Sequence, residues 1–390
     1  MRKTAEIILP LHYGAAPPWL VTRMKGLADE TVRLLVEDKG AEEFLRRLSD
    51  PLWFQAFGCV LGFDWHSSGL TTVVTGVLKD ILTMEKHRVR VAGGKGRASR
   101  RAQEEIVVIG ESLGISSRQV EQLGYASRMA AKVDTAALQA GYPLYHHAFF
   151  VTETGNWCVI QQGINTHDRT ARRYHWLSEA LGNFVVEPHK AVVGDVVRQR
   201  VLNMIAKEAE ESRKACVDLV KGNPENLVSS IRRIGQGSSL DWWVEGVGSQ
   251  ITIESFEMPR RLDWNLFREI YDVQPDSFEE LLAFKGVGPA TVRALALVGQ
   301  LIFEKPACWR DPVKFSFAHG GKDGVPFPVD RMVMDRSIQT LKEIVSATEI
   351  ERERKVDALK RLSKLSSDWG LQATTLKGCS ISTVGNCCYS

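Results

Sequence analysis

Short segments in the first half of the chain are rich in residues that can bind metal ions or transfer protons. Asp64 and His66 lie two positions apart, and His146 is followed directly by His147. On a strand, residues two apart share one face and adjacent residues face opposite sides, so at most one of the two histidines can join a shared site. Carboxylates and imidazoles that converge can bind a divalent ion, so we predict a Mg²⁺ or Mn²⁺ site held by Asp64, His66 and His146.

Cationic residues near these segments indicate what such a metal site would act on. A divalent ion can activate a water molecule against a phosphodiester and neutralise charge on the transferring group. Lys95 lies in the glycine-rich segment 93–96, where we expect a loop, and could contact the phosphate together with Arg172 and Arg173. The residues predicted to act in this hydrolysis are Asp64, His66, Lys95, His146 and His147.

The same residues also allow a purely structural interpretation. Asp64 can cap a helix that begins near Ser67 or Ser68, because an aspartate side chain accepts hydrogen bonds from the free amides of a first helical turn. His66 can be a buried residue with satisfied hydrogen bonds. At this stage both interpretations stay open.

Residues 278–295 have the pattern of two helices joined by a glycine turn. Gly286 and Gly288 permit positive φ and leave no Cβ between the backbone and a ligand. Val287 can fill the space between the helices, and Pro289 suits the first turn of the second helix because its missing N–H is not needed there. The free amides at that N-terminus would form a phosphate site, assisted by the helix dipole.

Cationic side chains flank this glycine turn. Lys285 precedes the first glycine and Arg293 follows in the second helix, so both can contact the same DNA strand. Contacts of this kind bind the phosphate backbone and imply little base specificity. The residues predicted to bind DNA are Lys285, Gly286, Val287, Gly288, Thr291 and Arg293, with Arg172 and Arg173 from the earlier segment.

This segment resembles a known DNA-binding motif. Residues 278–297 are similar to the helix-hairpin-helix of the endonuclease III-type DNA glycosylases, and residues 328–333 resemble that family's downstream segment with its catalytic aspartate. The resemblance implies that the hairpin binds DNA and that Asp330 lies near the sugar of a bound nucleotide. Pro289 and Ala290 stand where bifunctional members carry a Schiff-base lysine, and the chain has no set of four closely spaced cysteines.

The polar segments and the hairpin together resemble a second family, an archaeal and bacterial one called the domain of unknown function 763 family. Its name implies no activity. The segments that carry this resemblance are residues 10–14, 64–69, 93–96, 145–147, 161–165 and 171–176, with the C-terminal hairpin.

The spacing of apolar residues predicts an α+β fold. Residues 145–165 indicate a β-hairpin, because two β-forming runs flank the turn residues 154–156. A third strand is expected at residues 183–186, and Ser277 followed by Glu280 is typical of a capped helix start. Helices are predicted at residues 19–36, 41–48, 70–81, 104–113, 117–123, 195–219, 266–271, 277–282, 291–302 and 331–362.

These elements predict a mixed α/β domain with a hairpin-containing sheet, followed by an all-α helix-hairpin-helix domain. A chain of 390 residues has room for two or three domains. The expected division is a catalytic domain at 1–190, a helical connector at 191–250, a DNA-binding domain at 251–369 and a flexible tail at 370–390.

Composition and cysteine placement favour a cytoplasmic protein. A net charge of +3 permits DNA binding without arguing for it. The chain has no run of ~20 apolar residues, and its first residues lack the layout of a signal peptide, so no membrane association is expected. Isolated cysteines in apolar stretches, typical of buried thiols in a reducing compartment, are Cys59, Cys158, Cys216 and Cys308.

Three functions are compatible with this sequence. The expected one is a metal-dependent DNA nuclease of repair or recombination, with the hairpin holding DNA and Mg²⁺ or Mn²⁺ as cofactor. The second is a glycosylase-like base-excision enzyme, in which Asp330 stabilises an oxocarbenium-like sugar after base flipping. The third is a DNA-binding protein of a repair complex that has no catalytic activity.

Overall fold

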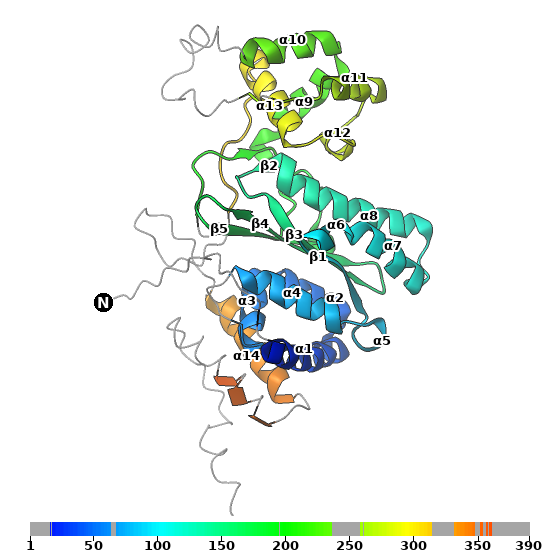
Figure 1. The fold of residues 1–390 in the computed structure, drawn as a ribbon, viewed down its shortest axis with the longest axis vertical. Helices are drawn as coiled ribbons and strands as arrows, with labels where there is room; N and C mark the ends of the chain where they lie inside the picture. The colour runs from blue at the N-terminus through cyan, green and yellow to red at the C-terminus, as the bar shows by residue number, and fades with distance from the viewer. Residues whose placement is uncertain are drawn as a thin grey trace, which may run out of the picture.

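Three layers are stacked along the long axis of the molecule (Figure 1). A layer of N-terminal helices forms one end and covers one face of a central antiparallel sheet. Further helices cover the opposite face of the sheet, and a group of C-terminal helices forms the far end. The arrangement confirms the predicted α+β fold class. The computed structural model describes residues 16, 18–63, 68–194, 196–235, 258–259, 261–313, 331–347, 352–353, 356–357 and 359–360.

The N-terminal layer confirms the helices predicted before residue 82. The side chain of Asp50 accepts hydrogen bonds from the backbone amides of Leu52 and Trp53, and Pro51 fills the first helical position, so α3 begins sharply after α2. Every residue of α3 is buried. The helices of this layer are α1 (Pro18–Lys39), α2 (Ala41–Ser49), α3 (Pro51–Val60), α4 (Gly69–Ile81) and the short α5 (Met84–His87).

The central sheet has five antiparallel strands in the order β1-β3-β4-β5-β6. Its apolar side chains alternate between two cores, one shared with the N-terminal helices and one shared with the helices on the other face. The predicted hairpin at residues 145–165 is confirmed as β3 and β4. The strands are β1 (Val89–Lys95), β3 (Leu144–Thr152), β4 (Trp157–Asn165), β5 (Thr170–Leu177) and β6 (Ala191–Gly194).

Two predictions for this region are wrong. Residues 183–186 do not form a strand, since residues 184–187 form bends. Residues 93–95 are not a loop but the end of β1, where Lys95 pairs with His146 of β3. Gly93 has a φ of 89°, and a Cβ there would lie 2.2 Å from the carbonyl oxygen of His147, so glycine is needed for the close approach of two strands.

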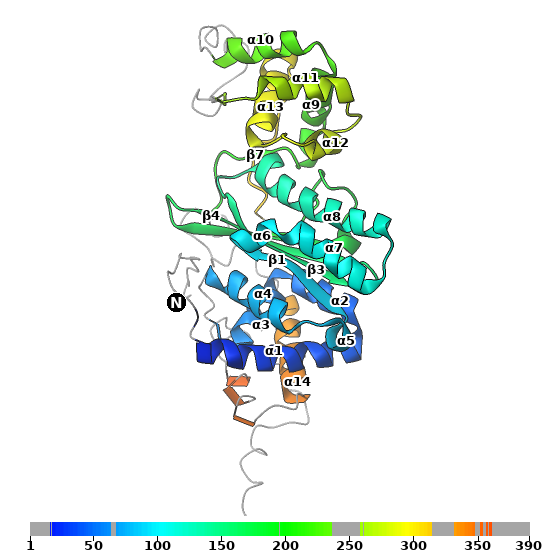
Figure 2. The ribbon, with the colours of Figure 1, turned by 45° about the vertical axis from the view of Figure 1, so that its right-hand side comes forward.

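The second face of the sheet is covered by α7 and α8 (Figure 2). Ser116 and Gln119 form a capping box at the start of α8, which runs nine residues beyond the predicted end at 123. A π-helical turn (Val133–Ala137) follows and leads into β2 (Leu138–Gln139), which pairs with β7 (Leu202–Asn203). The helices here are α6 (Arg97–Arg100), α7 (Ala102–Leu113) and α8 (Ser117–Lys132).

The C-terminal helices pack on the α8 side of the sheet. The helix predicted at 195–219 starts only at Glu210, because residues 196–209 hold β7 and a 3₁₀ turn (Lys207–Ala209) instead. A second 3₁₀ turn (Ser178–Ala180) follows β5. The C-terminal helices are α9 (Glu210–Lys221), α10 (Pro224–Gly235), α11 (Trp264–Val273), α12 (Phe278–Ala283) and α13 (Pro289–Phe303).

The last long helix, α14 (Arg331–Ala347), lies at the opposite end of the molecule from α13 (Figure 1). It packs against α3 and α1, and its Leu341 and Val345 are buried in the core of the N-terminal layer. The predicted domain at 251–369 therefore contains elements from both ends of the fold. In the part of the chain that the structure describes, every helix is too short or too polar to span a lipid bilayer.

Candidate functional site

The glycine turn predicted to bind DNA joins two helices, α12 and α13. Ser277 caps α12 by accepting a hydrogen bond from the amide of Glu280, while the Glu280 carboxylate accepts from the amide of Asp276. Gly286 has a φ of 94°, which favours glycine, and the side chain of Val287 is only 3% exposed in the core between the helices. The local sequence therefore builds a compact turn with a fixed shape.

Side chains from the sheet layer hold this turn in place. The Nζ of Lys132, the last residue of α8, donates hydrogen bonds to the carbonyl oxygens of Leu282, at 2.7 Å, and of Phe284. Burial lowers the pKa of the Lys132 ammonium. Gln139 of β2 donates from Nε2 to the carbonyl oxygen of Pro289 at 2.9 Å. The hairpin is thus fixed to the sheet at both of its helices.

The solvent-facing part of the turn is small. Lys285 and Gly286 are exposed, and Gly288 is partly exposed. Gly288 is the N-cap residue of α13 and offers no side chain to cap the first amides. The first amides of a helix have no acceptor within the helix, so they remain available to an anion.

The other predicted hairpin contacts are less accessible. Thr291 is 5% exposed, and Val287 is buried, so only their backbone could meet a ligand. Arg293 is half-buried, and its guanidinium lies 5.6 Å from the ring centroid of Trp309. The structure therefore brings Lys285, Gly286 and Gly288 together on one surface.

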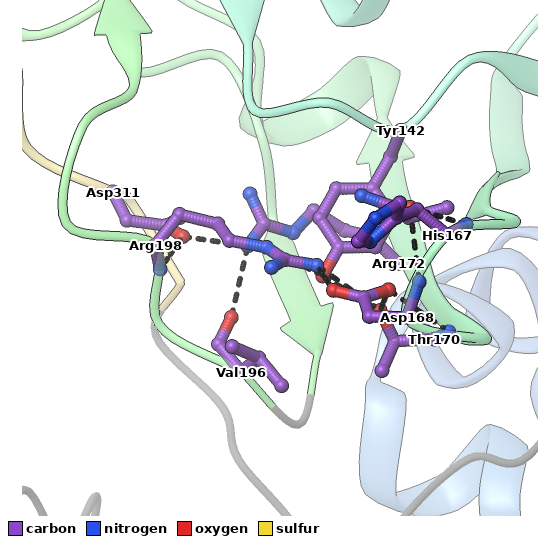
Figure 3. Close-up of polar contacts among 9 residues, drawn as sticks. Tyr142, His167, Asp168, Thr170, Arg172, Val196, Arg198 and Asp311 are labelled. Carbon is purple, nitrogen blue, oxygen red and sulfur yellow. Dashed lines mark hydrogen bonds and ion pairs between the residues drawn. The ribbon is translucent and has the colours of Figure 1, made fainter. Parts of the chain in front are cut away.

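Arg172 and Arg173, which we predicted to contact phosphate, are buried on opposite faces of the sheet. Arg172 is fully buried, and its Nη2 donates to Asp311 Oδ2 at 2.6 Å and to the carbonyl oxygen of Val196 (Figure 3). Arg173 is 1% exposed and donates from Nε to His175 Nε2 at 2.9 Å. In this conformation a phosphate could reach neither guanidinium without opening the sheet.

The Arg172 cluster joins the segment after α13 to β5 of the sheet (Figure 3). Arg172 and Arg198 both lie over the ring of Tyr142, at 4.5 and 5.1 Å from its centroid. Asp311 Oδ2 also accepts a hydrogen bond from the backbone amide of Arg198 at 2.7 Å. Arg198 is further paired with Asp168. These contacts close a structural ion-pair network that the sequence does not reveal.

His146 and His147 face opposite sides of β3, as predicted for adjacent residues on a strand. Both ring nitrogens of His147 are engaged, with Ser127 Oγ at 2.9 Å and with Gln161 Oε1 at 2.7 Å. Gln161 in turn donates to Asp134 Oδ2 at 2.5 Å. Burial lowers the pKa of His147, so the ring is neutral and has no nitrogen left for a metal ion.

His146 lies in a different environment. Its Nε2 contacts Thr75 Oγ1 at 3.0 Å, but its Nδ1 has no hydrogen-bond partner among the residues that the structure describes. On the neighbouring strand, Gln162 donates to the carbonyl oxygen of Ser68 and to the Tyr145 hydroxyl, while its own Oε1 has no partner in the described part of the chain. Burial lowers the pKa of His146 to about 3, with smaller contributions from His147 and Lys95, so the imidazole is neutral.

These residues form one row across three strands. Lys95, His146 and Gln162 are register partners, and Lys95 at the edge is exposed. Ser68, which binds Gln162, lies two positions after the predicted ligand His66 and four after Asp64, and those two lie outside the described residues. Asp330 lies outside them as well. Among the residues described, no three His, Cys, Asp or Glu side chains are grouped to hold a metal ion.

The polar group that sequence reasoning missed is centred on Asp134. Its carboxylate is buried and accepts hydrogen bonds from Gln161, from Trp176 Nε1 at 3.0 Å and from His189. The available signal was a lone acidic residue in the otherwise small and apolar segment 133–138. The buried cysteines were predicted correctly, since the thiols of Cys59, Cys158, Cys216 and Cys308 are all free and buried.

Comparisons with known proteins give one finding. Searches of curated proteins and of solved structures returned no match. A sequence model of the family described as "Protein of unknown function (DUF763)" matches residues 5–329. Because the match spans most of the 390 residues, the chain belongs to this family.

Proposed function

We propose that this protein binds DNA through the turn between α12 and α13. The observation that carries the proposal is an exposed glycine turn at the uncapped N-terminus of a long helix. Gly286 and Gly288 place no side chain over the amides, and Lys285 adds a positive charge beside them. Backbone amides, a helix dipole and a lysine together suit the phosphate of a DNA strand.

Rigidity also supports this proposal. Val287 is anchored in the core, Lys132 holds the carbonyl end of α12, and Gln139 holds the first residue of α13. A preformed site loses little conformational entropy when it binds its ligand. Contacts with phosphates do not distinguish bases, so we expect binding to depend on salt more than on DNA sequence.

Gly288→Val tests this proposal directly. A Cβ at Gly288 would meet only the Gly286 carbonyl oxygen, at 3.9 Å, and its φ of −137° suits valine, so the variant should fold normally. The new side chain would cover the amides, and we expect about tenfold weaker binding to a short labelled duplex in fluorescence anisotropy. Gly182→Val is the matched control, since a Cβ there meets nothing within 4 Å. A folded Gly288→Val protein with unchanged affinity would refute the proposal.

A second candidate activity is metal-dependent cleavage of the bound DNA. One observation favours it: two buried atoms that have no partner within the described ranges, His146 Nδ1 and Gln162 Oε1, belong to register partners beside Lys95. A neutral imidazole and an amide oxygen are metal ligands, and the sequence adds Asp64 and His66 shortly before Ser68. A divalent ion there would supply a water nucleophile and charge neutralisation.

The cleavage assay compares labelled DNA with Mn²⁺ or Mg²⁺ against DNA with EDTA. His146→Gln should abolish metal-dependent cleavage, and the exposed His167→Gln is the control. If the His146→Gln protein cleaves DNA as fast as the wild type, the proposed metal site at His146 is wrong. The glycosylase-like alternative predicts abasic product without metal that is lost in Asp330→Asn. Binding without either product would favour a DNA-binding protein of a repair complex.

A further inference from the structure

The surface beside α6 carries three cations without a carboxylate partner. Lys95, Arg97 and Arg100 are exposed, and within the described ranges none of their side chains forms a hydrogen bond or an ion pair. Residues 95–104 contain four basic residues and a single carboxylate, Glu104. We call Lys95, Arg97 and Arg100 the α6 cluster, and its surroundings keep an excess of positive charge.

Exposed cations elsewhere in the described part of the chain are commonly paired. Arg46, for example, binds Glu179 at 2.6 Å. The carboxylate of Glu105, which follows the α6 cluster in the chain, is already bound by Lys79 at 2.6 Å and lies 4.0 Å from Arg101. The α6 cluster therefore keeps its positive potential, and an anion with several charges is the partner that suits it.

Two cations of α8 connect the α6 cluster with the hairpin. Arg128 is exposed, and its Nη1 donates to Oε1 of Gln103 at 3.1 Å, in the first turn of α7 directly after α6. Lys132 lies one turn later on the same face of α8 and donates to the carbonyl oxygen of Phe284, next to Lys285. In Figures 1 and 2, α6 lies below α8 and α12 lies above it. Cations thus extend from the hairpin across α8 to α6.

This arrangement determines which anion would suit the surface. Because the cations are spread over three elements, they match a polymer of phosphates better than a single ion, and duplex DNA carries one negative charge per about 1.7 Å of its axis. We propose that duplex DNA held at the hairpin continues across α8, where Arg128 contacts its phosphates, and reaches Arg97 and Arg100 at α6. This extension rests on the proposed function.

The extension also gives the DNA a path past the His146 row. Lys95 of the α6 cluster is the register partner of His146. A duplex that contacts both the hairpin and α6 would therefore pass the edge of the sheet at which the candidate metal site lies. Phosphate contacts of this kind fix the position of the DNA and carry no base specificity.

Replacing Arg97 and Arg100 together with glutamine tests the extension. Both side chains lack contacts within the described ranges, so the variant should fold normally, and thermal unfolding checks this. We expect at least tenfold weaker binding to a labelled duplex at low salt in fluorescence anisotropy. In a plot of the logarithm of the binding constant against the logarithm of the salt concentration, the slope should become shallower by about 0.9 for each lost contact. Lysine at both positions restores the charge and should recover most of the affinity.

The matched control is Arg118→Gln with Arg233→Gln. It removes the same net charge from exposed positions, at the opposite end of α8 from Lys132 and in α10, and should leave the slope unchanged. An equal loss of affinity in this control would show that only net charge matters and would overturn the extension. Calorimetry should count one duplex per chain, and two duplexes per chain would overturn the extension as well.

Gly288→Val, measured on the same duplex, separates the extension from the hairpin proposal. If Gly288→Val weakens binding while the Arg97→Gln, Arg100→Gln protein keeps the wild-type affinity and slope, the extension is overturned and the hairpin proposal stands. If only the Arg97→Gln, Arg100→Gln protein binds more weakly, the hairpin proposal fails and the contacts at α6 hold without it. Weaker binding by both supports one continuous interface.

Discussion

Lys132 donates a hydrogen bond to the carbonyl oxygen of Phe284, and this contact links the end of α8 to the turn between α12 and α13. The same ammonium group also binds the carbonyl oxygen of Leu282. The last carbonyls of a helix lack partners within it, so Lys132 supplies a donor to Leu282 in α12 and a second donor to the C-cap residue Phe284, whose carbonyl oxygen also accepts from the amide of Val287. The position of the turn therefore depends on a residue about 150 positions earlier in the chain.

Replacing Lys132 with methionine should destabilise the protein and loosen the turn. The variant leaves two carbonyls without their charged donor, and we expect a loss of about 2 kcal/mol in the free energy of unfolding. Urea denaturation measures this loss, with the exposed Lys86→Met as the control. DNA affinity should fall as well, and equal stability of the two variants would contradict the role assigned to Lys132.

Replacing Lys285 with serine should change the salt dependence of DNA binding. The Lys285 side chain is exposed beside the glycine turn. In a plot of the logarithm of the binding constant against the logarithm of the salt concentration, each phosphate contact that is lost makes the slope shallower by about 0.9. Anisotropy titrations at several salt concentrations measure this slope. Lys39→Ser, in the N-terminal layer, is the matched control. Identical slopes for both variants would place the DNA elsewhere on the surface.

Replacing Asp311 with alanine should be strongly destabilising. Both side chains of the Arg172–Asp311 pair are fully buried, so the variant would leave a buried guanidinium without its counter-charge. We expect a loss of about 3–5 kcal/mol in the free energy of unfolding. The double variant Arg172→Met, Asp311→Ala should recover part of this loss in urea denaturation. A cost below about 1 kcal/mol for the single variant would show that the pair is dispensable.

The buried histidines predict that stability falls in acid. Folding lowers the pKa of His146 to about 3, whereas an unfolded histidine titrates near 6.5. Between these values the unfolded chain binds a proton that the folded chain does not. The contribution of His146 to the free energy of unfolding is therefore fully present above pH 6.5 and is lost as the pH falls toward 3. Each such histidine contributes about 1.4 kcal/mol per pH unit.

The corresponding measurement is urea denaturation between pH 7 and pH 4, for the wild type and for His146→Gln. The variant has one proton less to bind on unfolding, so its stability should depend less steeply on pH. The exposed His167→Gln should keep the wild-type slope. A wild-type slope for His146→Gln would show that His146 is not held neutral.

Local patterns in the sequence were enough for the β-hairpin, for the two helices around the glycine turn and for most of the N-terminal helices, but not for the start of α9 or the end of α8. Turn residues 154–156, the cap at Ser277 and Pro289 at the start of α13 each act through neighbours a few positions away. The opposite orientation of His146 and His147 also followed from the alternation of a strand. Such features depend on backbone geometry within one element, so the sequence alone determined them.

Tertiary structure alone decided where the charged residues lie. From the sequence alone an arginine is expected at the surface, because arginine is rarely buried unless it is paired. Arg172 is nevertheless buried, since Asp311, 139 positions later, supplies its counter-charge. Asp134 and His189 meet across 55 positions, and β1 reaches its place in the sheet only by pairing with β3. Burial of a charge requires a partner, and when that partner is distant in the chain, only the folded structure identifies it.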